Sequence, residues 1–182
     1  MRSVRRHFAV IGAVAGLLAS GCGGGSSSGV SADFYIQTVC TAVRSWAHEI
    51  ESRSGSLNVA KITNARQGKA AIQTFLAAAV ADTRQATSKL KAAGTPAISG
   101  GTQVSSALVS SFAQIETALR QGERKANALP ADDPVAFPGA GRALARDVQR
   151  ALSNIGSGLS GLKSPELEKA AQKEPACVPL GA

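Results

Sequence analysis

The sequence predicts an all-α fold, an antiparallel up-down-up-down four-helix bundle with a short C-terminal helix and a tail pinned by a disulfide. Apolar residues recur at steps of three and four from residue 32 onward, and glycine and proline separate the runs. No segment shows sustained alternation of apolar and polar residues, so no sheet is expected. A chain of 182 residues with 44% hydrophobic content suits one modest domain, which we place at residues 32–182.

The first two helices are predicted at residues 32–52 and 59–93. The first carries one apolar stripe, bordered by Trp46 and formed by Ile36, Val39, Cys40, Val43, Ala47 and Ile50. The second carries a heptad seam of Ile72, Leu76, Ala79, Thr83, Ala86, Leu90 and Ala93. Gly94 is placed to cap its C-terminus and Pro96 to stop it, while Gly68 indicates a bend or a second start.

Three further helices follow at residues 102–129, 140–162 and 165–172. The third has its apolar positions at Val104, Leu108, Phe112, Ile115, Leu119, Gly122, Ala126 and Leu129. The fourth has its apolar positions at Leu144, Val148, Leu152, Ile155 and Leu159. Pro130 ends the third helix, and the pair Ser164 and Pro165 is typical of an N-cap followed by the first helical residue.

The first 21 residues have the order of a secretory signal peptide. Three arginines lie among the first seven residues, an apolar run of 12 residues follows at 8–19, and the small residues Ala19, Ser20 and Gly21 come next. The run is too short for a transmembrane helix, which needs about 20 apolar residues. We therefore expect residues 1–21 to be removed.

The sequence Leu17-Leu18-Ala19-Ser20-Gly21-Cys22 resembles the lipobox of bacterial lipoproteins. It departs from that pattern at Ala19, where the family prefers leucine. The resemblance implies lipidation of Cys22 and a protein anchored at the outer face of the cytoplasmic membrane, with residues 22–31 as a flexible Gly/Ser tether. The leader and tether are similar to those of actinobacterial lipoproteins. The alternative is an ordinary secreted protein in which Cys22 has no role.

Cys40 and Cys177 are the two cysteines left once Cys22 is acylated. Cys40 lies near the start of the first helix and Cys177 lies after the end of the fourth, and an antiparallel four-helix bundle brings these two places to the same end. Because an exported protein can form disulfides, we predict a Cys40–Cys177 bond. The alternative is two buried free thiols.

Little in the chain points to catalysis or to a metal. His48 is the one histidine outside the leader, so any Ser-His-Asp site would need it, and no nucleophile motif accompanies it. Asp132 and Asp133 offer two oxygen ligands in a loop otherwise rich in proline, alanine and valine, which favours turn formation over a calcium site. We predict no catalytic residue, metal or cofactor.

Basic and small residues supply the remaining candidate features. Arg142, Arg146 and Arg150 share one side of the fourth helix and could contact an anionic surface or an acidic partner, or could be solvated. Outside the leader the chain has 17 basic and 12 acidic residues and no nucleic-acid-binding motif, so no nucleic-acid partner is expected. Small residues allow close helix packing or a ligand pocket, and they cluster in the second and fourth helices, at Ala77, Ala78, Ala79, Ala81, Gly156, Gly158 and Gly161.

The sequence thus favours a non-enzymatic, membrane-anchored helical binding or interaction module of the cell envelope. Its partner, an envelope protein or a lipid, and its oligomeric state are left open. One alternative is a carrier or chaperone for a lipid or small apolar ligand, with its pocket between the second and fourth helices. A further alternative is a hydrolase that uses His48.

Overall fold

A computed structural model describes residues 29–56, 63–156 and 164–180, and most of them are helical. The helices are α1 (Ala32–Ser56), α2 (Ala65–Ala92), α3 (Gly101–Asn127), α4 (Phe137–Gly156) and α5 (Pro165–Lys173), followed by the 3₁₀ turn η2 (Val178–Leu180). The described residues form no strand, and none of their helices is long and apolar enough to cross a membrane.

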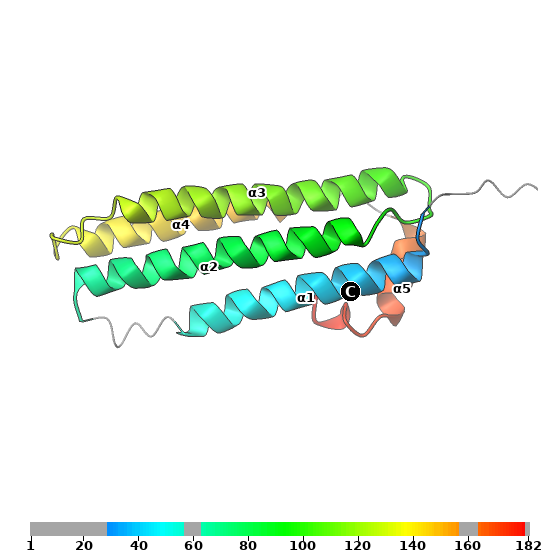
Figure 1. The fold of residues 1–182 in the computed structure, drawn as a ribbon, viewed down its shortest axis with the longest axis horizontal. Coiled ribbons are helices and arrows are strands. Elements are labelled where there is room, and N and C mark those ends of the chain that lie inside the picture. Colours follow the sequence, from blue (N-terminus) through cyan, green and yellow to red (C-terminus); the bar gives the residue numbers. More distant parts are fainter. Residues whose placement is uncertain (1–28, 57–62, 157–163, 181–182) are drawn as a thin grey trace, which may run out of the picture.

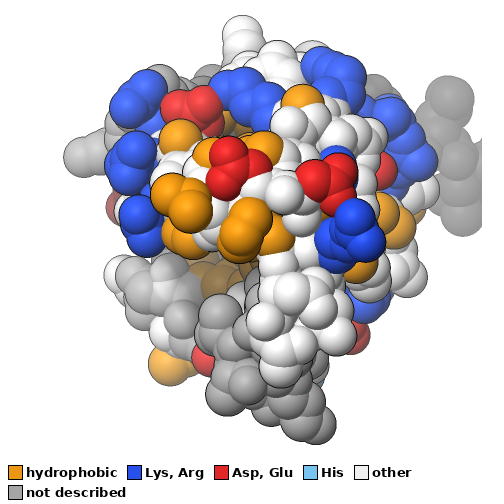
Figure 2. Space-filling model, turned by 90° about the vertical axis from the view of Figure 1, so that its left-hand side faces the viewer, with side chains coloured by type: hydrophobic (Ala, Val, Ile, Leu, Met, Phe, Trp, Pro, Cys, Tyr) orange, Lys and Arg blue, Asp and Glu red, His pale blue; other side chains and the backbone are white. Residues whose placement is uncertain are grey.

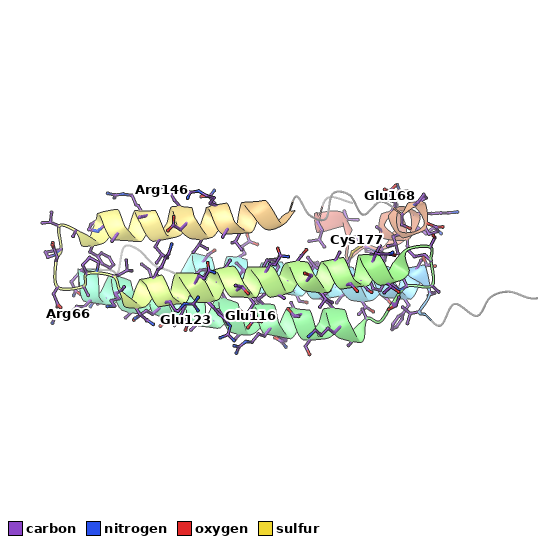
Figure 3. The ribbon with its side chains drawn as sticks, turned by 90° about the horizontal axis from the view of Figure 1, so that it is seen from above. Arg66, Glu116, Glu123, Arg146, Glu168 and Cys177 are labelled. Atoms are coloured by element: carbon purple, nitrogen blue, oxygen red, sulfur yellow. A yellow bond between two sulfur atoms is a disulfide. The ribbon has the colours of Figure 1, made fainter. Side chains whose placement is uncertain are left out.

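The helices pack mainly against their neighbours in sequence. α2 lies between α1 and α3, and α4 packs on α3, as the predicted up-down bundle requires (Figure 1). α5 and η2 pack on α1. Seen from above, α4 lies beside one half of the bundle, and α5 with the tail lies beside the other half (Figure 3).

The core consists of three apolar clusters along the bundle axis. The first joins α1, α5 and the tail through Tyr35, Ile36, Cys40, Leu167 and Cys177, with Ala93 at the end of α2. The middle one contains Ala42, Ala86, Leu90 and Phe112. The third joins α2, α3 and α4 through Leu76, Ala79, Val80, Leu119, Ala126, Leu129 and Leu144. The seams predicted for the second and third helices therefore form the interior.

The disulfide between Cys40 and Cys177 confirms the predicted pairing. Their Cα atoms lie 5.1 Å apart, and the bond joins α1 to the segment between α5 and η2. Both cysteines are buried in the first core cluster. The bond therefore holds the C-terminal tail against α1, as expected.

Two helices begin at different residues from those predicted. α2 begins at Ala65 rather than 59, because the side chain of Asn64 caps it by accepting a hydrogen bond from the Gln67 N–H. Gly68 accordingly lies in the first turn of α2 and marks no second start. α4 begins at Phe137 rather than 140, and the predicted end of this helix at 162 lies outside the described residues.

The folded part of the chain begins before residue 32, the predicted start of the domain. The Val30 N–H donates to the Thr95 carbonyl at 2.9 Å, and the Ala97 N–H donates to the Val30 carbonyl at 2.8 Å. These bonds tie Val30 to the loop between α2 and α3. The described fold therefore includes residues 29–31, which were expected to belong to the tether, and the rest of the tether lies outside the described residues.

Candidate functional site

The described residues form an apolar groove between α2 and α4, which we call the α2–α4 groove. It has a volume of about 440 Å³ and is open to solvent. Its walls are Ile72, Phe75 and Leu76 of α2 and Gly141, Leu144, Ala145, Val148, Gln149 and Leu152 of α4. Gln149 is the one polar side chain in this lining, and ligand sites commonly combine such an apolar wall with few polar groups.

The groove exists because α1 does not close against α4. α4 packs on α3 and α1 packs on α2, whereas α1 and α4 do not form one of the main helix pairs in the described parts of the chain. The apolar arc of α4 is wide: Leu144 packs inward, while Ala145 and Leu152 lie farther round the helix. One side of this arc meets α3, and the other side is left to line the groove.

Gly122 of α3 sets how closely α4 approaches. A Cβ atom at this position would lie 2.9 Å from Cγ2 of Val148 and 3.6 Å from Cδ2 of Leu76. The missing side chain thus lets Val148 pack onto the α3 backbone and fixes one wall of the groove. Gly141, by contrast, has open space where its Cβ would be.

An arginine follows each of three groove-lining residues of α4. Arg142, Arg146 and Arg150 come directly after Gly141, Ala145 and Gln149. Because successive residues of a helix are turned by about 100°, the three arginines lie beyond the Gln149 edge of that wall, with Arg142 nearest to the groove and Arg150 farthest from it. All three are exposed, and Figure 3 shows Arg146 on the outer side of α4.

The three arginines differ in their partners. Arg150 lies 3.8 Å from the carboxylate of Asp147, which also accepts a hydrogen bond from Lys125 of α3. The bond from Lys125, with the nearby positive charges, lowers the pKa of Asp147. The described residues form no ion pair with Arg142 or Arg146, although the charge of Arg146 also helps to lower the pKa of Asp147.

A second cleft, between α1 and α2, is smaller and polar. Its volume is about 210 Å³, and its lining includes Trp46, Glu49, Asp82 and Lys89. The guanidinium group of Arg53 on α1 donates two hydrogen bonds to the carboxylate of Asp82 on α2, at 2.5 and 3.1 Å. This carboxylate therefore helps to hold α1 against α2.

The other residues singled out by sequence lie apart from the groove. His48 is exposed on α1, and no hydrogen bond from it is described. Asp132 pairs with Arg66, while Oδ1 of Asp133 accepts the N–H groups of Val135 and Ala136, both at 2.9 Å. These carboxylates therefore organise the start of α4, and among the described residues no group of three or more metal-ligating side chains occurs. Cys22 lies outside the described residues.

Only some of the small residues singled out in the sequence lie among the described residues. Ala79 is fully buried in the core, whereas Ala77 and Ala81 are exposed, and Gly158 and Gly161 lie outside the described residues. The small residues that line the groove are instead Gly141 and Ala145, which the sequence reasoning did not select. The available signal was the breadth of the apolar arc on α4, which exceeds what contact with one neighbouring helix needs.

The exposed loop between α3 and α4 lies at the end of the bundle far from residue 29. Val135 in this loop is 89% exposed. Viewed from this end, apolar side chains gather near the centre, with Lys and Arg around them (Figure 2). Apolar surface is therefore uncovered at this end as well as in the groove, and Phe34, Val178 and Leu180 are exposed elsewhere on the described fold.

Fold and groove together define the class of an all-α bundle protein with a disulfide-held tail and a surface groove. Comparison with protein families, with curated proteins and with solved structures finds no match.

Proposed function

We propose that this protein is a non-enzymatic lipoprotein of the cell envelope, anchored by lipid on Cys22 at the outer face of the cytoplasmic membrane, and that its bundle binds a partner or ligand through the α2–α4 groove. The arginine-rich leader and the lipobox-like residues before Cys22 support the anchor.

The groove is the observation that carries the binding role. Exposure of apolar surface to water costs about 25 cal/mol per Å², so a ligand that covers the apolar lining of the groove would gain free energy by removing it from water. Gly122 holds α4 tightly on α3, and the groove wall is therefore a fixed surface of the bundle.

The position of the groove suits a binding site held away from the bilayer. Residue 29 lies at the end of the bundle with the α2–α3 loop, because Val30 bonds to that loop. The seven residue-to-residue steps from Cys22 to Gly29 would reach about 13 to 16 Å as a flexible chain. Leu76 lies 16 residues before Ala92, which adds about 24 Å of helix. The groove would face the space outside the membrane.

Intact mass of the protein from its native membrane tests the anchor. We expect a species that begins at Cys22 and carries acyl chains, and we expect it to partition into detergent. The Cys22→Ser variant should lack the acyl mass and remain in the aqueous phase. An unacylated wild-type protein cut at another residue would contradict the anchor.

Binding of a neutral fluorescent probe, Nile red, to the purified bundle tests the groove. The matched pair Gly141→Leu and Gly139→Leu suits this test, because neither Cβ would meet another atom within 4 Å and only Gly141 lines the groove. We expect Gly141→Leu to reduce probe binding and Gly139→Leu to preserve it. Absent or unaffected binding would contradict the groove as a binding site.

A carrier or chaperone for a lipid or small apolar molecule is a second candidate, and the same apolar lining favours it. Native mass spectrometry of the protein purified from its membrane separates the two roles. A carrier retains extracted lipid, and a module that binds only proteins does not.

A further inference from the structure

We propose that the α2–α4 groove takes the hydrocarbon chain of a single-chain anionic amphiphile, a long-chain fatty acid, whose carboxylate is bound by Arg142 and Arg146. This inference rests on the proposed function of the groove as the binding site. It adds the shape and the charge of the ligand.

The dimensions of the groove fit one hydrocarbon chain. Its α4 wall runs from Gly141 to Leu152, about 16 Å along the helix axis. Its volume of about 440 Å³ is spread along that length, which suits an extended chain lying parallel to α4.

The lining fits a chain without polar groups. Ile72, Phe75, Leu144, Val148 and Leu152 are apolar, and the lining contains no Asp, Glu, Lys or Arg. A polar ligand would lose hydrogen bonds to water here and recover few from the walls. A hydrocarbon chain loses none.

The charge at the edge of the groove fits an acid. Arg142 and Arg146 are exposed one residue after the wall positions Gly141 and Ala145, and the described residues form no ion pair with either of them. A guanidinium group presents paired N–H donors that match the two oxygens of a carboxylate. The nearest acid on α4, Asp147, is bonded to Lys125 of α3 and lies 3.8 Å from Arg150, and the charge of Arg146 acts on it more weakly.

The test is displacement of Nile red from the groove by dodecanoate and by its neutral counterpart dodecanol, each below the concentration at which it forms micelles. Exposed ion pairs contribute about 0.2 to 1 kcal/mol each, so two arginines predict tighter binding of dodecanoate by about 2- to 25-fold. The preference should shrink from 10 mM to 500 mM salt, because exposed charges are screened.

Substitution of the arginines locates the acid site. In Arg142→Gln/Arg146→Gln we expect the preference for dodecanoate to disappear, while Nile red still binds. Arg142→Lys/Arg146→Lys keeps the charges and should retain part of the preference. Arg150→Gln is the matched control, because Arg150 lies on the same helix and faces Asp147. It should leave the preference unchanged.

The outcomes separate this inference from the proposed function. Equal displacement by dodecanoate and dodecanol, or a preference that survives Arg142→Gln/Arg146→Gln, would overturn the fatty-acid proposal and leave an apolar groove. Failure of Nile red to bind would overturn both. A third outcome combines two results: the wild type does not bind dodecanoate, and Gly141→Leu changes the oligomeric state measured by light scattering. These results would show that a second copy of the chain covers the groove, and they would also overturn the fatty-acid proposal.

Discussion

The indole Nε1 of Trp46 on α1 donates a 3.0 Å hydrogen bond to Oγ1 of Thr83 on α2. Thr83 is fully buried, and its hydroxyl in turn donates to the Ala79 carbonyl at 2.8 Å. The ring of Trp46 also meets Phe112 of α3 edge-on, with centroids 5.2 Å apart. The side chain of Trp46 thereby fixes the position of α1 against α2 and α3 in the middle of the bundle.

Thr83→Val should therefore destabilise the bundle. The substitution keeps the volume of the side chain but leaves the half-buried Trp46 N–H without this acceptor and removes the bond from the buried Thr83 hydroxyl to Ala79, a combined loss of about 1 to 3 kcal/mol. Urea unfolding followed by the fluorescence of Trp46, the one tryptophan in the sequence, measures the change.

Thr87→Val is the control for this prediction. Thr87 also donates to the carbonyl four residues earlier, but its hydroxyl has no described partner on another helix. We expect a loss of less than about 1 kcal/mol, because only the weaker local bond is removed. Equal losses in the two variants would contradict a special role for the bond to Trp46.

Reduction of the Cys40–Cys177 bond should lower the stability of the whole domain. The bond closes a loop with a sequence separation of 137 residues, and loss of such a bond removes about 2 to 5 kcal/mol. The urea midpoint should fall with reductant, and trypsin should cut sooner near Lys173 in α5. The Cys40→Ser/Cys177→Ser variant should show the lower midpoint without reductant and no further fall with it.

Gly122→Leu should destabilise the contact between α3 and α4. The new side chain would overlap Val148, and overpacking of this kind costs about 1 to 3 kcal/mol. Gly139→Leu places the same side chain in open space, so its thermal midpoint should be unchanged or higher. A Gly122→Leu protein as stable as the wild type would mean that α4 is not held closely at this point.

Acid should weaken the bundle through Asp147. Hydrogen bonding from Lys125 lowers the pKa of this carboxyl from its ordinary value of 3.8. A carboxyl group whose pKa is lower in the folded state than in the unfolded state stabilises the fold at pH values above the unfolded pKa. That stabilisation is lost as the pH falls through 3.8 toward the pKa of the folded state. Urea unfolding at pH 7 and at pH 3 should therefore differ more in the wild type than in Asp147→Asn.

Glu51→Gln provides the comparison for the acid prediction, because Glu51 is exposed and the described residues form no ion pair with it. It should leave the difference between pH 7 and pH 3 as in the wild type. A difference that is equally large in Asp147→Asn would assign the acid sensitivity to other carboxyl groups.

Much of the fold could be predicted because helical periodicity and capping residues are local signals. The seam from Leu76 to Leu90 lies in the core as expected, and Ser164 and Pro165 start α5 as expected. The predicted starts of α2 and α4 were wrong because polar side chains accept backbone N–H groups at other residues. Asn64 and Asp133 both accept backbone N–H groups at helix starts, and the apolar pattern alone placed those starts elsewhere.

The groove and its charges needed the tertiary structure. The sequence gives Arg142 and Arg146 one side of a helix and gives Leu152 a place in an apolar row, but it does not tell which neighbour covers that row. Which helix covers the apolar row of α4 depends on how closely α1 and α3 pack against α2 and α4. Gly122 shows the difference: its place on the seam followed from spacing, whereas its contact with Val148 depends on the approach of two helices.

Periodicity, capping and cysteine position act along the chain, so the helical class, the two ends that the Cys40–Cys177 bond joins and the residues of the central seams follow from the order of the amino acids. The packing of the helices, in contrast, leaves one side of α4 uncovered by α1, joins Val30 to the loop after α2 and forms the apolar groove. These features depend on distances between helices far apart in the sequence, and no local pattern specifies such distances.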